Sequence, residues 1–530
     1  MKQETIKKII VIVLFSFYGM VGVLLYHDYG ISSDEPTERE TTFTNIKYVL
    51  DTLGIDKLNG ANGDLENYQD KYYGIIMQVP PALIEWAKNF PGGAYIYYIR
   101  HLWTFLLCFG SYICFYLMCR EVLTSRWMSL LGTAMIAMYP RFFAEQFYNI
   151  KDMLFMAMFI VSMFVTVKMI QSKCSIFWTV LFSVTAAVTT NVRIVGLIFP
   201  VLLVGYLALA KILQKFEIVE LDVPIIQRII LIIVGYLLIY IASMPILWKH
   251  PVQQMIAVFT KFSDFDNWHG TIVFMGRILD GKNIPWYYIP IWQLISLPIW
   301  YLLLGVLILG IFLFVMIRNL KMGHKISINL ILQNKYILWA FLLAFLPWFA
   351  TVVAHSTLYN GWRHCYFLLP PIILLILSIL NYVWNYLKGK QIIKYSIMSI
   401  ILVGLILQTK WIISNHPYEM VYLNSAGRKW GSYFDRDYWH LTNVELCRYI
   451  LEHDNSEQIS LQAPNDVFLH FWKDEDKEKK RIILDNKNPE YIIETYRGKT
   501  GNNNILEGYE DFYSITIDGY RIATIFKRSS

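Results

Sequence analysis

Long apolar stretches recur along the whole chain and constrain its fold more than any other feature. A helix that crosses a bilayer needs about 20 mainly apolar residues. Hydrophobic residues make up 56% of the 530 residues and charged residues only 16%, whereas soluble proteins carry roughly 25% charged residues. The sequence therefore predicts a polytopic α-helical membrane protein with about eleven transmembrane helices. The predicted spans are residues 8–26, 95–118, 127–143, 153–170, 176–190, 194–212, 228–247, 290–317, 336–354, 365–387 and 395–414.

Lysine and arginine are unevenly shared between the connections that join these spans. The positive-inside rule places connections rich in these residues in the cytoplasm. With a cytoplasmic N-terminus, the predicted cytoplasmic segments hold Lys2, Lys7, Lys8, Arg120, Arg126, Lys168, Lys173, Lys211, Lys215, Arg228, Arg318, Lys321, Lys325, Lys335, Lys388, Lys390 and Lys394. The short outer loops hold far fewer, notably Arg141, Lys151, Arg193 and Arg363. We therefore expect an integral plasma-membrane protein with its N-terminus inside and its C-terminal region outside.

Three outer segments are too long to be simple turns, namely residues 27–94, about 248–289, and the region from about 415 onward. Charged residues become frequent from Asp435, and no later run is long enough to cross a bilayer. Residues 513–525 alternate in polarity about Asp518-Gly519, which is a strong hairpin pattern. We predict a membrane module over residues 1–414, with 27–94 as its first outer loop, and a small extracytoplasmic α/β domain over residues 415–530.

Acidic residues occur at two predicted membrane exits on the outer side. Asp34 and Glu35 lie just beyond the first span, and Asp152 begins the fourth. A carboxylate in such a place can act as a general base. The alternatives are a solvated pair beside a turn-forming proline for residues 34–35 and a helix N-cap for Asp152. Two carboxylates on one membrane face are a more specific pattern than either alone.

Basic residues interrupt apolar sequence on the same predicted face. Lys151, Arg193, Arg363 and His364 each lie at a span boundary. Ionisable residues at such positions are costly and often functional, and a guanidinium group offers a planar fork of donors that suits phosphate. The alternative is that these side chains extend toward the lipid headgroups. No group of His and Cys residues has metal-ligand spacing, so the sequence requires no metal or other cofactor, although a divalent ion is compatible with it.

Several short motifs resemble those of the GT-C glycosyltransferases, in particular the family 39 group of protein O-mannosyltransferase-like bacterial enzymes. These motifs appear in family order over about residues 33–440. They are Ser33-Asp34-Glu35-Pro36; the run from Tyr139 to Asp152; Asn191 to Leu197; Ile284-Pro285-Trp286-Tyr287-Tyr288; Tyr359 to His364; His416-Pro417-Tyr418 with Val421-Tyr422-Leu423-Asn424; and Asp437-Tyr438-Trp439. The resemblance implies a GT-C fold, a polyprenyl-phosphate-linked sugar donor and an inverting transfer.

The resemblance also implies roles for particular residues. Asp34 would be the base, and Asp152 would shape the site, with Glu145 as a second acidic candidate in that loop. The C-terminal region differs from the repeat-type domain of eukaryotic protein mannosyltransferases. The sequence does not choose between a glycan, a lipid and a protein as the acceptor.

These observations lead to one prediction about function and one alternative. We predict a membrane glycosyltransferase that uses a lipid-linked donor, contacts membrane lipids and has no nucleic-acid partner. Transfer from phosphate with one carboxylate base needs no covalent sugar intermediate and inverts the anomeric carbon. The predicted catalytic residues are Asp34, Glu35 and Asp152, and the predicted donor-phosphate ligands are Lys151, Arg193, Arg363 and His364. The alternative is a transporter or flippase for a lipid-linked sugar, and a third possibility is a scaffold without catalysis.

Overall fold

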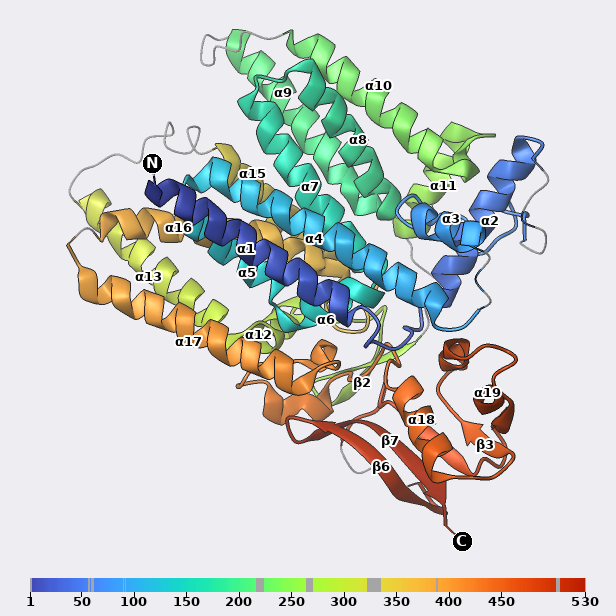
Figure 1. The fold of residues 1–530 in the computed structure, drawn as a ribbon. Coiled ribbons are helices and arrows are strands. Elements are labelled where there is room, and N and C mark those ends of the chain that lie inside the picture. The colour runs from blue at the N-terminus through green and yellow to red at the C-terminus, as the bar shows by residue number, and fades with distance from the viewer. Residues whose placement is uncertain are drawn as a thin grey trace.

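Apolar helices packed side by side form most of the molecule, which we describe from a computed structural model (Figure 1). The structure describes residues 2–55, 58, 62–88, 90, 92–215, 224–263, 270–321, 335–387, 389–501 and 506–529. Within these residues, nine helices are long and apolar enough to cross a membrane. They are α1 (Lys2–Leu25), α4 (Tyr95–Leu123), α7 (Asp152–Gln171), α9 (Ile198–Lys215), α10 (Ile225–Ser243), α13 (Ile299–Lys321), α15 (Lys335–Val353), α16 (Leu369–Tyr386) and α17 (Gln391–Asn415). The predicted polytopic membrane fold is confirmed.

Two further predicted spans are short helices rather than full ones. The prediction of one helix over 127–143 was wrong, because the chain forms α5 (Arg126–Ala137), of 12 residues, and then α6 (Pro140–Tyr148). Pro140 is the cause: it disfavours the α conformation of the preceding residue, and Tyr139 is extended with ψ 120°. The predicted span 176–190 is α8 (Ile176–Val192), a helix of 17 residues that packs against α7 and α10.

The predicted span 290–317 is also divided. It consists of α12 (Tyr288–Ser296) and the later α13, which begins at Ile299. Leu297, the residue before Pro298, is extended with ψ 139°, as expected of a residue that precedes proline. In the part of the chain that the structure describes, the expected spans, about eleven, therefore become nine full-length apolar helices, with α5 and α8 as shorter members of the bundle.

The two ends of the bundle differ in what they carry. At one end, short turns join α4 to α5 and α7 to α8, and Glu4 pairs with Arg126 while Lys168 pairs with Glu121. At the other end, which we call the site end, lie Leu25, the short helices α2 (Glu35–Thr52), α3 (Val79–Lys88) and α11 (Pro251–Ser263), and the C-terminal region (Figure 1). This arrangement matches the alternation expected from the loop charges. Which end faces the cytoplasm stays a prediction.

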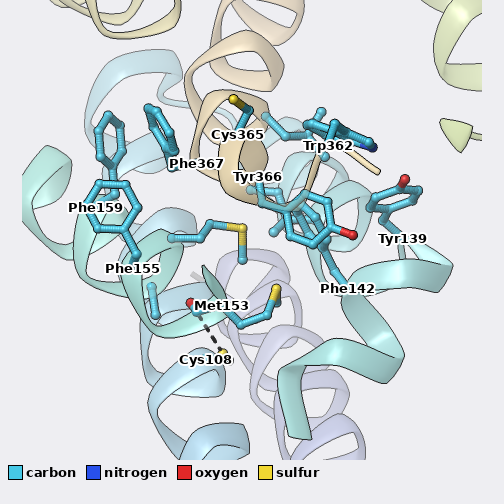
Figure 2. Close-up of a cluster of buried hydrophobic side chains, with 14 of the residues drawn as sticks. Cys108, Tyr139, Phe142, Met153, Phe155, Phe159, Trp362, Cys365, Tyr366 and Phe367 are labelled. Atoms are coloured by element: carbon cyan, nitrogen blue, oxygen red, sulfur yellow. Dashed lines mark hydrogen bonds between the residues drawn. The ribbon is translucent and has the colours of Figure 1, made fainter. Parts of the chain in front are cut away.

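A cluster of aromatic and aliphatic side chains fills the bundle beneath the site end. The 3₁₀ helix η3 (Arg363–Leu368) places Cys365, Tyr366 and Phe367 against α6 and α7 (Figure 2). Phe367 packs on Phe155 with ring centroids 5.0 Å apart. Close packing of this kind holds side chains in fixed rotamers, so the residues that precede the cluster have a rigid support.

The C-terminal region contains a five-stranded sheet of order β4-β3-β5-β7-β6. Its strands are β3 (Ile459–Gln462), β4 (Ile482–Leu484), β5 (Tyr491–Glu494), β6 (Tyr509–Ile517) and β7 (Tyr520–Arg528), and its helices are α18 (Asn443–His453) and α19 (Lys477–Arg481). Strand β3 is parallel to β4 and β5, whereas β7 is antiparallel to β5 and β6. Ile517 pairs with Tyr520 across the Asp518-Gly519 turn, which confirms the predicted hairpin. The predicted small α/β region is confirmed, and its boundary at residue 415 stays a prediction.

Shorter elements connect these parts. A separate hairpin of β1 (Thr271–Phe274) and β2 (Arg277–Asp280) lies at the site end beside the C-terminal region. The remaining 3₁₀ helices are η1 (Ile194–Leu197), η2 (Pro245–Leu247), η4 (Glu419–Val421), η5 (Arg428–Tyr433) and η6 (Val467–Phe471).

Candidate active site

A cavity of about 330 Å³ opens at the site end of the bundle. Its volume lies within the range of small-ligand sites, roughly 300–1,000 Å³. Among the described residues that line it, Asp34 is the one carboxylate, while the basic residues are Lys151, Arg193, Lys282, His355, Arg363 and His364. Apolar side chains cover another part of the wall, including Val192, Val195, Met244, Val258 and Phe367. The cavity therefore offers a cationic surface beside an apolar one.

Asp34 stands at the start of α2 and presents its carboxylate to this cavity. Its Oδ2 lies 3.0 Å from Nη1 of Arg363, and 43% of the side chain is exposed. Pro36 in the first turn suits the start of a helix, because its missing N–H would have no partner there. The backbone N–H of Ser33 donates to the carbonyl of Trp439 at 3.1 Å. On the other side, the carbonyl of Asp34 accepts the N–H of Glu38 at 3.0 Å, so contacts on both sides of residue 34 fix its position.

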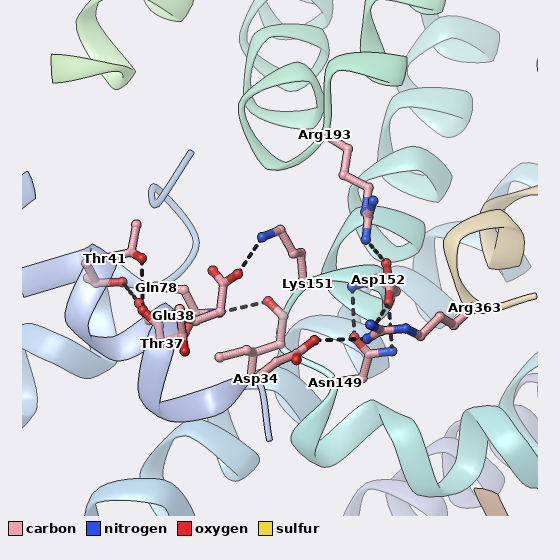
Figure 3. Close-up of polar contacts among 12 residues, drawn as sticks. Asp34, Thr37, Glu38, Thr41, Gln78, Asn149, Lys151, Asp152, Arg193 and Arg363 are labelled. Carbon is pink, nitrogen blue, oxygen red and sulfur yellow. Dashed lines mark hydrogen bonds and ion pairs between the residues drawn. The ribbon is translucent and has the colours of Figure 1, made fainter. Parts of the chain in front are cut away.

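Asp152 lies behind the cavity wall rather than in it. It begins α7, its side chain is 1% exposed, and it contacts both Arg193 and Arg363, the latter at 3.4 Å (Figure 3). Asn149 accepts a hydrogen bond from the backbone N–H of Asp152 at 2.9 Å. Asp152 is therefore a shared anchor for two guanidinium groups. The structure brings it close to Asp34, as predicted, since one Arg363 nitrogen touches both carboxylates.

Arg363 is held from several directions. Its guanidinium carbon lies 4.3 Å from the ring centroid of Trp439 and 5.1 Å from that of Tyr359. Such cation–π contacts stabilise a cation in a partly dry environment. Together with Asp34 and Asp152, these rings leave the guanidinium little freedom to rotate. A lipid-facing arginine that extends to the headgroups would not be enclosed in this way, so the alternative reading of Arg363 is not supported.

Lys151 and His364 complete the cationic wall. Lys151 pairs with Glu38 and lies 3.3 Å from the ring centroid of Tyr73. The ring of His364 packs edge-on against Tyr359, with centroids 4.5 Å apart. All four predicted phosphate ligands thus line one cavity with Asp34.

Two predicted acidic candidates lie away from the cavity. Glu35 is fully buried, with its Oε1 3.0 Å from Nε2 of His101 and its Oε2 accepting the N–H of Ser32 at 2.7 Å. Glu145 is also fully buried and accepts hydrogen bonds from Tyr366 at 2.7 Å and from other neighbours. Neither lines the cavity, so both hold the structure around the site.

Some residues of the site were not predicted. Glu38 could have been found, because it follows Asp34 by four residues and therefore shares its helix face. The aromatic residues Tyr73 and Tyr359 and the base Lys282 carry no pattern that separates them from other interfacial side chains. Their part in the site depends on tertiary contacts.

Comparison with known proteins supports the predicted resemblance. Residues 80–257, about a third of the chain, match the family model described as dolichyl-phosphate-mannose-protein mannosyltransferase. A search of curated proteins finds no match. Among solved structures, the crystal structure of ArnT from Cupriavidus metallidurans bound to undecaprenyl phosphate matches with 12% identity, a TM-score of 0.45 and coverage of 97% of both chains. The family match confirms the resemblance over the segment that contains Lys151, Asp152 and Arg193, and it indicates a glycosyltransferase. The structural likeness is too distant to assign any residue a role.

Proposed function

We propose that this protein transfers a sugar from a polyprenyl-phosphate donor to an acceptor hydroxyl, with inversion at the anomeric carbon, at the outer edge of the membrane. The observation that carries this proposal is the cavity in which one accessible carboxylate, Asp34, faces a cationic wall beside apolar side chains. The family that matches residues 80–257 is named for a dolichyl-phosphate sugar. A lipid-linked phosphate would suit the cationic and apolar parts of the wall together.

The chemistry follows from the positions of the charged groups. The acceptor hydroxyl gives its proton to Asp34 as its oxygen attacks the anomeric carbon. The bond between this carbon and the phosphate oxygen breaks, and its electron pair leaves with the lipid phosphate. Arg193, Arg363 and Lys151 stabilise the negative charge that develops on this leaving group. Asp152 is enclosed by two arginines, and Asp34 is the one carboxylate among the described residues that line the cavity. We therefore expect no covalent sugar intermediate.

We also propose that the reaction needs no metal. Within the part of the chain that the structure describes, no group of three or more His, Cys, Asp or Glu side chains is arranged to hold a metal ion. Turnover that persists in excess EDTA would support this, whereas turnover that stops with EDTA and returns with Mg²⁺ or Mn²⁺ would overturn it.

Purified protein in lipid nanodiscs would test the function directly. A panel of short-chain polyprenyl-phosphate sugars would be supplied together with a cell-envelope extract. We expect one donor to be consumed, with release of polyprenyl phosphate and labelling of an envelope component. A transporter would instead move the intact donor across liposome membranes and consume none of it, and that result would contradict the proposal.

A further inference from the structure

An arginine that forms no salt bridge with a described carboxylate lies in the C-terminal region, close enough to Asp34 to feel its charge. Lys151, Arg193 and Arg363 each face a carboxylate. By contrast, none of the described carboxylates forms a salt bridge with Arg497, and its Nη1 instead meets Nε2 of His440 at 3.4 Å. Arg497 is partly buried. The carboxylates of Asp34 and Asp435 act on its charge through space, without a direct ion pair. Withdrawing a cation from water without a directly paired anion is costly, and the anion of a ligand would complete the pairing.

The contact between Arg497 and His440 is built into the fold. Arginine can only donate hydrogen bonds, so Nε2 of His440 must accept, and Nδ1 must carry the ring proton. That proton points to Thr495, whose Oγ1 is 2.7 Å from Nδ1. Burial and the Arg497 charge lower the pKa of His440 to about 3, so the ring stays neutral. The hydrogen bond between Thr495 and His440 and the one between His440 and Arg497 therefore fix the guanidinium in one orientation.

The same turn of the chain positions Asp34. The carbonyl of Trp439 accepts the N–H of Ser33 at 3.1 Å, and the turn itself is closed by Asp437, which accepts the N–H of Thr442 at 2.9 Å and its hydroxyl at 2.7 Å. Residue 440 of this turn has φ +60°, a conformation that non-glycine residues seldom adopt. The imidazole that holds the guanidinium is thus one residue away from the backbone contact beside Asp34.

Arg497 lies outside the set of residues that line the donor cavity, and it belongs to the C-terminal region rather than to the helix bundle. We propose that Arg497, oriented by His440, binds a phosphate or carboxylate group of the acceptor whose hydroxyl approaches Asp34. The planar fork of a guanidinium matches both anions. This inference rests on the proposed transfer function and adds that the acceptor is anionic.

The experiment separates acceptors by charge. A cell-envelope extract is divided on an anion-exchange column into retained and unretained fractions, and each fraction is offered to the protein in nanodiscs with a labelled short-chain polyprenyl-phosphate sugar. Arg497→Gln and Arg497→Lys are compared with the wild type. Arg521→Gln is the matched control, because Arg521 lies in the same region but pairs with Asp511.

We expect the wild type and the control to label the retained, anionic fraction. Arg497→Gln should lower this labelling at least tenfold through a higher KM for the acceptor, with the KM for the donor within about twofold of wild type, and Arg497→Lys should fall between. If the Gln variant does not elute as one peak in size exclusion, the Lys variant carries the comparison.

Three results would overturn the inference. They are labelling of the unretained fraction alone by the wild type, a raised KM for the donor in the Arg497 variants, and unchanged labelling by those variants. The second result would assign Arg497 to the donor phosphate. Failure of the wild type to consume any donor would instead refute the proposed function, and the inference with it.

Discussion

Two networks of ion pairs flank helix α2. Both consist of carboxylates paired with basic side chains, but only one of them includes a carboxylate that is exposed to a cavity. On the cavity side, Asp34 and Asp152 share Arg363, and Arg193 pairs with Asp152. Here one carboxylate, that of Asp34, keeps 43% of its side chain exposed. This network combines fixed charges with an opening for a ligand.

In the second network, the carboxylates of Glu35 and Glu85 are enclosed. Glu35 pairs with His101 at 3.0 Å, and neither side chain has any exposed surface. Arg100 pairs with Glu85 at 2.7 Å, and Arg39 donates to the same carboxylate. These ion pairs fasten α2 to α3 and α4.

The comparison shows how two consecutive carboxylates acquire different roles. Asp34 and Glu35 are adjacent in the sequence, yet the start of α2 directs them to opposite networks. A buried, paired carboxylate costs stability if its partner is lost, whereas an accessible one can exchange protons with a ligand. The predictions below test this contrast, from the largest expected effect to the smallest.

Asp34→Asn should cause the largest loss of activity. A general base contributes about 10²- to 10⁴-fold to rate, and we expect kcat to fall by that amount with the thermal unfolding temperature unchanged. Asp51→Asn is a matched control, because Asp51 lies on the same helix but pairs with Lys47 at its exposed end. Initial rates of labelled sugar transfer would give the activity of both variants. Activity within tenfold of wild type in Asp34→Asn would remove Asp34 as the base.

Arg363→Ala should cause the next largest loss. Removing one charged contact to a developing anion costs about 2.7–4 kcal/mol in the barrier, or roughly a hundredfold or more in rate. Arg363→Lys keeps the charge but loses the fork and the flat contact with Trp439, so we expect an intermediate rate. Steady-state kinetics against donor concentration would compare them. Near-wild-type turnover in both variants would leave Arg193 or Lys151 as the phosphate ligand.

Glu35→Ala should act mainly on stability. It leaves buried His101 and the N–H of Ser32 without their partner, and breaking a buried pair in this way costs about 3–5 kcal/mol. Glu35→Gln should cost less, because its amide can serve both neighbours. Thermal unfolding in detergent would report the loss, while kcat of the folded fraction should stay within about tenfold. A loss of kcat as large as that of Asp34→Asn, with unchanged stability, would contradict the contrast between the two networks.

Asp435 should have a smaller effect, which is a change in how the stability of the fold depends on pH. Burial raises the pKa of Asp435 to about 6, although the N–H groups of Gly498 and Val273 favour its charged form. Because the folded state binds the proton more tightly than the unfolded state, this residue stabilises the fold at pH below about 4, and that contribution disappears as the pH rises through 6. A rise of the pKa from 3.8 to about 6 corresponds to at most about 3 kcal/mol of stability. Unfolding temperatures between pH 4 and 7 should fall less in Asp435→Asn than in wild type; parallel profiles would refute this.

The fold was largely predictable because the bilayer imposes a simple rule on composition. Among the described residues, nine apolar helices overlap the spans that the hydropathy pattern predicted. The errors at 127–143 and 290–317 both arise at prolines, Pro140 and Pro298, where an apolar run continues but the helix does not. Hydropathy alone does not predict that a helix ends at a proline within an apolar run.

The sequence predicted several of the residues that lie at the site, but it did not predict which of them are exposed to the cavity. Asp34, Lys151, Arg193 and Arg363 could be grouped because they share one predicted membrane face. A carboxylate can be exposed to the cavity or buried in an ion pair with an arginine. Which of the two occurs depends on tertiary contacts, which no local sequence pattern encodes. For this reason the burial of Asp152 among its arginines was not foreseen.

The stereochemistry of the transferred sugar tests the central claim most directly. One accessible carboxylate opposite a cationic wall implies a single displacement from the phosphate. Using a donor of known anomeric configuration, NMR of the isolated product would read the configuration at the new glycosidic bond. The account predicts the opposite configuration to that of the donor. A product that retains the donor configuration would require a covalent or otherwise doubly displaced intermediate and would contradict the role given to Asp34.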